Sequence, residues 1–236
     1  MLLAEIDATL ARFMASVDVM TTNLLELEAN PTNKLLEPAS LTGVTQAQVA
    51  GVRQTLLSLW EHFTEFKALV ERAQAMRGTT GHLPQSRLQE LEALMVGPSI
   101  ALPPIDVPLD RRGLYTPSQT LVATTPDELL RNMGAAFDAV KKVVLAVDEA
   151  WRALVPRVSA AQDEVTALTG LAVTLGETDL SLDRVRSRVD VLSQQVGRDP
   201  LSVTAEEFDQ VEATLATARA RLDQLSNDRA ALDRDL

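Results

Sequence analysis

Several residue types are scarce or absent in this chain of 236 residues, and each scarcity excludes a class of structure or chemistry. There is no cysteine, which excludes disulfide bonds, thiolate metal sites and cysteine nucleophiles. Aromatic residues make up only 3% of the chain, and its hydrophobic residues, 46% of the total, are mostly Leu, Val and Ala. This composition is typical of helical bundles rather than of β-sheets.

The chain also has fewer basic than acidic residues, and it lacks long apolar runs. The chain has 22 Lys and Arg against 33 Asp and Glu, which gives a net charge of −11. An acidic surface repels phosphate backbones and anionic lipid headgroups, so we expect no nucleic-acid partner. The longest fully apolar run is about five residues, from Val143 to Val147, which is far too short to span a bilayer or to form a signal peptide.

The residues that usually carry catalysis are few and dispersed. The two histidines, His62 and His82, are isolated, and we expect His62 on the exposed side of its helix. The sequence contains no Gly-rich phosphate loop, no H-E-x-x-H, no G-x-S-x-G and no Glu-x-x-His pair. We therefore predict that the protein is not an enzyme and has no cofactor and no metal site.

The longest predicted helix runs from Thr125 to about Leu175. Thr125 and Glu128 have the spacing of a capping box, and Pro126 occupies the first helical position, where its missing donor costs nothing. Two adjacent rows of apolar residues form a face that is too wide for a two-stranded coiled coil and suits a bundle. Pro156 should kink this helix, yet the apolar pattern resumes beyond it. We expect one bent helix that serves two helical layers, with two helices broken near Pro156 as the alternative.

Heptad spacing of apolar residues predicts further helices over residues 3–29, 45–77, 86–96, 182–196 and 204–236. The second of these should begin at a capping box formed by Thr45 and Gln48. The prediction is an all-α fold of antiparallel helical bundles, with two stacked sub-bundles that share one long kinked helix. Residues 1–125 would hold a helical hairpin, a short helix and a strap, and residues 126–236 the long helix and a second hairpin. These parts would form either one compact unit or two tandem bundles.

Residues 98–124 form the one irregular region, with five prolines that forbid a helix. We expect an extended strap laid along the helices, because its apolar residues alternate with others. Long irregular segments are often functional, which makes Arg111, Arg112 and Tyr115 candidates for binding an anionic group or the acidic surface of a partner. Solvated loop charges are the more common alternative.

The two tryptophans, Trp60 and Trp151, are candidates for lining a ligand pocket between helices, which is a usual place for a pocket in bundles. Packing in or beside a core is the more frequent role for such residues.

The ends of the chain lack helix signals. No capping residue precedes Leu3, and no stop signal follows Leu225. We expect the terminal helices to continue into flanking segments such as two membrane-spanning helices. The extracytoplasmic side is the expected location, although the helix ends alone do not fix the side of the membrane. Frayed natural termini and a cytoplasmic location are the alternative.

Three short elements resemble a known family. They are N-P-T-N-K-L-L from Asn30, L-T-G-V-T from Leu41 and D-P-L from Asp199. With the stretch from Leu24 to Gly78, about a third of the chain, they look like actinobacterial all-helical proteins, and in particular like the helical sensor domain of a membrane protein. That membrane protein acts with a glutamine/aspartate-binding lipoprotein and signals to a soluble Ser/Thr kinase.

The resemblance implies a non-enzymatic sensor or interaction domain whose partner is a protein, with a solute-binding lipoprotein as the candidate. Binding of the partner would be relayed through helix movement. The alternative is a cytoplasmic coiled-coil-like scaffold that forms homodimers through exposed heptad seams.

Overall fold

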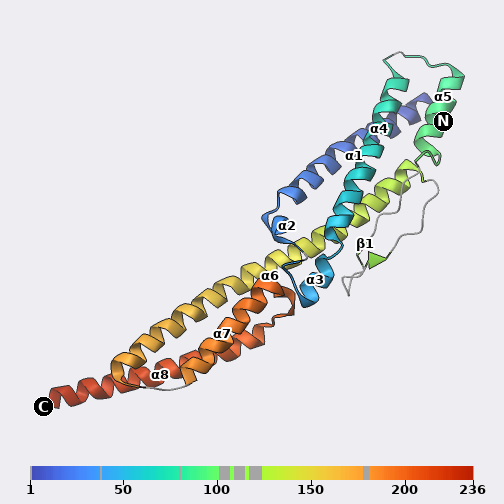
Figure 1. The fold of residues 1–236 in the computed structure, drawn as a ribbon. Coiled ribbons are helices and arrows are strands. Elements are labelled where there is room, and N and C mark those ends of the chain that lie inside the picture. The colour runs from blue at the N-terminus through green and yellow to red at the C-terminus, as the bar shows by residue number, and fades with distance from the viewer. Residues whose placement is uncertain are drawn as a thin grey trace. The chain divides into compact units, whose positions relative to one another are not determined.

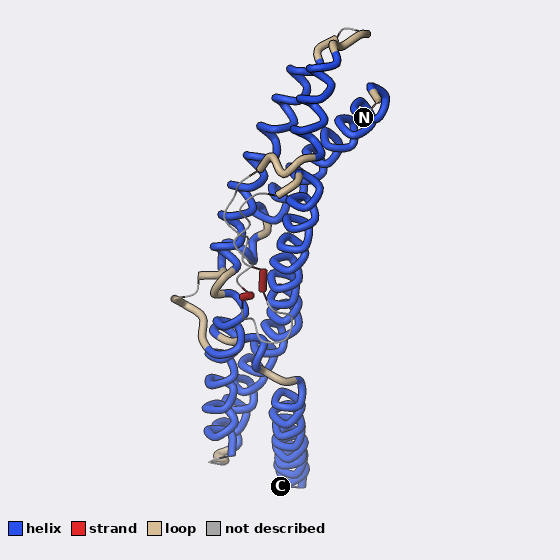
Figure 2. Tube along the Cα trace, turned by 90° about the vertical axis from the view of Figure 1, so that its right-hand side faces the viewer, coloured by secondary structure: helices blue, strands red, loops and turns tan. Residues whose placement is uncertain are grey.

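The protein is all-α, as predicted (Figure 1). The structure is a computed structural model that describes residues 2–37, 39–79, 81–100, 107–108, 115–116, 124–177 and 181–235. Figure 2 shows that helices make up nearly all of this described chain, with two very short strands beside them.

The chain divides into two compact units. Unit 1 comprises Met1–Pro38 and Ala47–Leu145, and unit 2 comprises Ala39–Gln46 and Ala146–Leu236. The helix α6 (Pro126–Leu175) contributes its first part to unit 1 and its longer remainder to unit 2. A single helix therefore supplies residues to both cores.

Unit 1 buries the apolar faces of α1 (Leu3–Ala29), α4 (Val52–Arg77), α5 (Gln85–Val96) and the first part of α6. The short helix α2 (Pro31–Leu35) follows α1 directly. The rings of Phe13 and Phe66 meet edge to face at 5.4 Å, and both side chains are fully buried. The core residues of α1 follow the predicted heptad pattern except at Val17, which is only half-buried: Ile6, Leu10, Phe13, Met20, Leu24 and Leu27.

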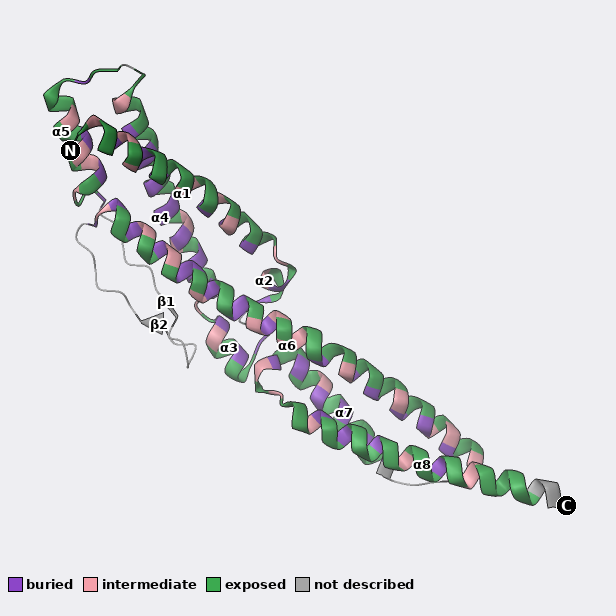
Figure 3. Cartoon of the chain, turned by 180° about the vertical axis from the view of Figure 1, so that it is seen from behind, coloured by how far each residue is buried: buried purple, intermediate pink, exposed green. Residues whose placement is uncertain are grey.

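Unit 2 has a core formed by the remainder of α6 with α7 (Ser181–Arg198) and α8 (Ala205–Asp235). A single 3-10 turn, η1 (Pro200–Ser202), joins α7 to α8. In each helix the buried residues form a stripe along one face (Figure 3). The members buried most deeply include Val165, Val189, Leu192, Phe208 and Leu215.

The long helix α6 continues through Pro156, which confirms the prediction of one helix over two helices broken there, and the kink at Pro156 stays a prediction. Leu154 and Val158, on either side of the proline, are both buried in the core of unit 2. Their burial offsets part of the roughly 3 kcal/mol that a proline costs inside a helix.

The predicted capping box at the start of α6 is confirmed. Thr125 N–H donates to Glu128 Oε2 at 3.1 Å, and Glu128 N–H donates to the Thr125 hydroxyl at 3.2 Å. Hydrogen bonds from the Thr125 backbone, the Thr125 hydroxyl and the Thr124 hydroxyl hold the pKa of Glu128 below its usual value.

The capping box predicted at Thr45 is wrong. Thr45 is the third residue of a separate short helix, α3 (Gly43–Val49), and α4 begins only at Val52. The amide of Thr45 is bonded to a distant residue instead, as described below.

The exposed position predicted for His62 is also wrong, because only 3% of this residue is accessible. The buried face of α4 is wider than one heptad seam. A second row of residues seven apart, Thr55, His62 and Leu69, is buried beside the first.

Most of the predicted extended strap, residues 101–106, 109–114 and 117–123, lies outside the described residues, and the structure describes its two ends and two short strands. The strands β1 (Val107–Pro108) and β2 (Tyr115–Thr116) pair antiparallel. At the base of the loop, Ile100 N–H donates to Thr124 O at 3.2 Å and Thr124 N–H donates to Ile100 O at 2.6 Å. The segment therefore leaves and rejoins the helices at one place.

Candidate functional site

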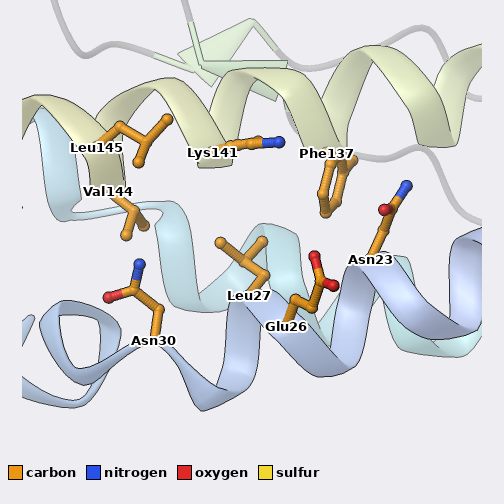
Figure 4. Close-up of a pocket in the computed structure, with 8 residues that line it drawn as sticks. All are labelled: Asn23, Glu26, Leu27, Asn30, Phe137, Lys141, Val144 and Leu145. Carbon is orange, nitrogen blue, oxygen red and sulfur yellow. The ribbon is translucent and has the colours of Figure 1, made fainter.

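A groove with a volume of about 230 Å³ lies between α1 and α6 in unit 1 (Figure 4). Each wall comes from residues three or four apart, which share one face of their helix. The α1 wall consists of Asn23, Glu26, Leu27 and Asn30, and the α6 wall of Phe137, Lys141, Val144 and Leu145.

The floor of the groove is apolar. Leu27, Phe137 and Val144 are each less than 10% exposed, and their side chains point into the space between the helices in Figure 4. Leu145, at the edge, is 41% exposed. The groove is therefore lined by buried apolar side chains, with Leu145 as the accessible apolar residue at its edge.

Two opposite charges flank this floor. Glu26 from α1 and Lys141 from α6 form no hydrogen bond and no ion pair with any residue that the structure describes. The Lys141 ammonium lies 5.7 Å from the centre of the Phe137 ring, a cation–π contact that keeps it beside the groove.

A hydrogen bond to the start of α2 fixes the orientation of the Asn30 side-chain amide. Its Oδ1 accepts from the Thr32 N–H at 2.8 Å and so caps α2. The Asn30 amide nitrogen is left pointing toward Val144 across the groove (Figure 4). The site thus combines one carboxylate, one ammonium and one amide donor with an apolar floor.

The two tryptophans proposed from the sequence lie in different units. Trp60 Nε1 donates to Glu28 Oε1 at 2.7 Å, and its ring meets Phe63 edge to face at 5.9 Å. Trp151 Nε1 donates to the carbonyl of Val196 at 2.9 Å, which ties α6 to α7. Neither tryptophan lines the groove between α1 and α6.

The remaining predicted site residues stay predictions. Arg111 and Arg112 lie outside the described residues. Tyr115 belongs to β2, of which the structure describes the backbone pairing with Pro108.

The sequence did not reveal a set of hydrogen bonds in unit 2 that joins residues 44–45 to residues 199–201. We call this set of bonds the clasp. The Asp199 carboxylate accepts from the N–H of Val44 at 3.1 Å and from the N–H of Thr45 at 2.8 Å, at the start of α3. In return, the Thr45 hydroxyl accepts from the Leu201 N–H at 3.1 Å. The two motifs L-T-G-V-T and D-P-L therefore meet in space, although about 155 residues separate them in the chain.

Gly43 is needed for this clasp. Its φ of +56° is a conformation that L side chains rarely adopt. A Cβ atom at this position would also overlap the Asp199 carboxylate. An unexplained glycine beside a helix start was the signal in the sequence, but it does not reveal the distant partner.

The charge state of Asp199 results from two opposing effects. Partial burial of the carboxyl raises its pKa, but hydrogen bonds from Thr45, Ser202 and Val44 favour the ionised form more strongly. The net result is a pKa below the usual value for an aspartate.

A second group of polar contacts ties α6 to α8 in unit 2. Arg157 donates from Nε to Glu212 at 2.8 Å and from its terminal nitrogen to Asp209 at 2.7 Å. Its guanidinium also lies 5.0 Å from the centre of the Phe208 ring. The hydrogen bonds to both carboxylates raise the pKa of Arg157, which stays charged at any accessible pH.

Among the described residues there is no group of three or more His, Asp or Glu side chains that would hold a metal ion. The described helices also include none with the length and apolar character that crossing a membrane requires.

Comparisons with models of protein families, with curated proteins and with solved structures give no match to this chain. The resemblance to helical sensor domains therefore stays a hypothesis, and the function must be argued from the geometry.

Proposed function

We propose that this chain is a non-enzymatic sensor domain of a membrane-anchored signalling protein. It binds a partner, for which a solute-binding lipoprotein of the amino-acid-binding class is the leading candidate. Binding is relayed to the rest of the signalling protein through movement of a helix.

The observation that carries this proposal is that α6 supplies residues to two separate cores. A continuous helix is stiff over its length, because backbone hydrogen bonds join successive turns, and Pro156 removes only one of them. A shift or rotation of its first part in unit 1 is therefore also imposed on its remainder in unit 2. Helix shifts of about 1–2 Å are a known means of transmitting a binding event.

The groove in unit 1 supports the same proposal. It lies against the part of α6 that runs from Phe137 to Leu145, immediately before the residues that belong to unit 2. Anything that binds there touches α1 and α6 together, and so changes the position of α6 relative to its neighbour.

Spin labelling tests the relay directly, because the absence of cysteine allows labels to be introduced without background. Cysteines replace two exposed residues, Asp18 on α1 in unit 1 and Asp163 on α6 in unit 2. The distance between the labels is measured before and after addition of purified amino-acid-binding lipoproteins. We expect a complex to form and the distance to change by about 1–2 Å. Absence of a complex with any of these proteins, or a complex with no change in distance, would contradict the proposal.

Membrane attachment is a separate part of the proposal. Fractionation of cells that express the full-length gene product tests it, and we expect the protein in the membrane fraction. Recovery in the soluble fraction alone would favour the second candidate function.

That second candidate is a cytoplasmic scaffold that forms homodimers. The observation in its favour is the last part of α8, where residues 227–232 are all exposed. Leu232 continues the heptad pattern of Leu225, yet it is 67% exposed. Light scattering decides between the two: a dimer that Leu232→Glu dissociates would support the scaffold, and a monomer at high micromolar concentration would exclude it.

A further inference from the structure

We propose that the groove between α1 and α6 binds a small zwitterion with an apolar body, of which an apolar α-amino acid is the natural example. The biological meaning of this inference rests on the proposed sensor function, but the binding itself requires no partner protein.

The charges of the groove match the two ends of such a ligand. Glu26 on α1 faces the groove with an unpaired carboxylate and would accept from the ligand's ammonium group (Figure 4). Lys141 on α6 would donate to the ligand's carboxylate. Because the two charges come from different helices, the ligand would bridge α1 and α6.

The floor matches the rest of the ligand. The edges of Leu27 and Phe137, with the more exposed Leu145, present apolar surface beside the two charges, and burying an aliphatic side chain against it contributes about 25 cal/mol per Å². A polar or charged side chain would gain nothing there and would lose its hydration.

The volume of the groove and the charge around it further limit which small zwitterions can bind. Its volume of about 230 Å³ is below the roughly 300–1,000 Å³ of sites for drug-sized ligands, so the ligand is a small metabolite. A ligand with an additional carboxylate, such as glutamate, would place that group near Glu26 on a surface that is already acidic. We therefore expect leucine or methionine to bind better than glutamate.

Methyl-labelled protein titrated with leucine tests the inference by NMR. We expect the methyl signals of Leu27, Val144 and Leu145 to shift in a saturable manner. Two leucine analogues serve as matched probes: 4-methylpentanoate lacks the ammonium group and 3-methylbutylamine lacks the carboxylate. Each should bind at least about tenfold more weakly than leucine, since each loses one charge-assisted hydrogen bond.

Variants of the two charged residues complete the test. Lys141→Met and Glu26→Gln should each weaken leucine binding about tenfold or more. Lys142→Met and Asp18→Asn make the same changes of charge on the same helices at residues that do not line the groove, and should leave binding unchanged. All four residues are exposed, so each variant should fold, which circular dichroism verifies.

Three results would overturn the inference: no saturable shift with leucine or methionine, equal affinity for leucine and its singly charged analogues, or equal affinity in Lys141→Met and Lys142→Met. These outcomes are independent of the spin-label experiment. The groove can bind leucine when no lipoprotein complex forms, and a complex can form when the groove binds nothing.

Discussion

The two units hold the same helix in different ways. In unit 2, polar bonds tie α6 to both of its neighbours: Trp151 to the Val196 carbonyl on α7, and Arg157 to Asp209 and Glu212 on α8. In unit 1, the bidentate ion pair of Asp127 with Arg12, at 2.6 and 3.0 Å, ties the start of α6 to α1.

Beyond that ion pair, the groove separates α1 from α6 in unit 1. Unit 2 has a groove of its own between α6 and α7, but it measures about 110 Å³, roughly half the volume, and its Arg186 donates to the Thr169 hydroxyl at 3.0 Å. The floor of this second groove, Val165 and Val189, is also buried, so the two grooves differ in volume and in the bond of Arg186 rather than in the kind of residue that lines them. The comparison indicates that unit 2 fixes α6, whereas unit 1 leaves it room to respond to a ligand.

The largest predicted effects are those of substitutions in the two hydrophobic cores, which test whether the two units unfold independently. Phe66→Ala in unit 1 and Leu215→Ala in unit 2 each remove a fully buried side chain, and should lower the free energy of unfolding by about 3–5 and 2–5 kcal/mol respectively. Because the cores are separate, each variant should lose amide protection mainly in its own unit. Hydrogen exchange measures this, and equal loss of protection in both units for either variant would show that the cores are not independent.

Removal of the clasp should have the next largest effect. Asp199→Ala leaves the N–H groups of Val44 and Thr45 without their acceptor, which should cost about 1–3 kcal/mol in denaturant unfolding. Asp223→Ala removes the same charge from an exposed site on α8 and should change little. Equal stability of the two variants would mean that the clasp contributes nothing.

The clasp should also respond to pH in a defined direction. The folded pKa of Asp199 is lowered, so its contribution is present above the unfolded value of about 3.9 and is lost as the pH falls through the folded pKa. Acid unfolding of the wild type and of Asp199→Ala measures this, and their stabilities should converge once the pH has fallen below the lowered pKa of Asp199. A difference that stays constant down to that pH would contradict the assignment.

How far the sequence could predict this molecule depends on the distance over which each interaction acts. The start of α6 follows from Thr125 and Glu128, three residues apart, and the core residues of α1 follow from their heptad spacing. The acceptor for Thr45 could not be predicted, because Asp199 approaches it only after unit 2 has folded.

The groove was missed for the same reason. In the sequence, Glu26 and Lys141 look like solvent-exposed charges on separate helices. Only the packing of the helices places them on two sides of one groove. The burial of His62 likewise depends on how many helices pack against α4, which the period of a single helix does not reveal.

The smallest predicted effect concerns the fixation of α6 in unit 2. Arg157→Lys retains the charge but cannot bond two carboxylates in a planar fork, and should cost about 1 kcal/mol in thermal or denaturant unfolding. The matched control is Arg152→Lys, where the arginine side chain is 78% exposed in an ion pair within α6, and its cost should be near zero. If both variants cost the same, the Arg157 bonds do not fix the helix.

The central claim is that one continuous helix, α6, is held firmly in unit 2 and more loosely in unit 1. Residue-resolved hydrogen exchange along α6 tests this claim most directly. We predict protected amides on both sides of Pro156, slower exchange from Val158 to Ala172 than from Met133 to Val144, and added protection of the latter stretch when leucine is present. A rapidly exchanging break around Pro156, or equal protection of the two stretches with no response to leucine, would contradict the account.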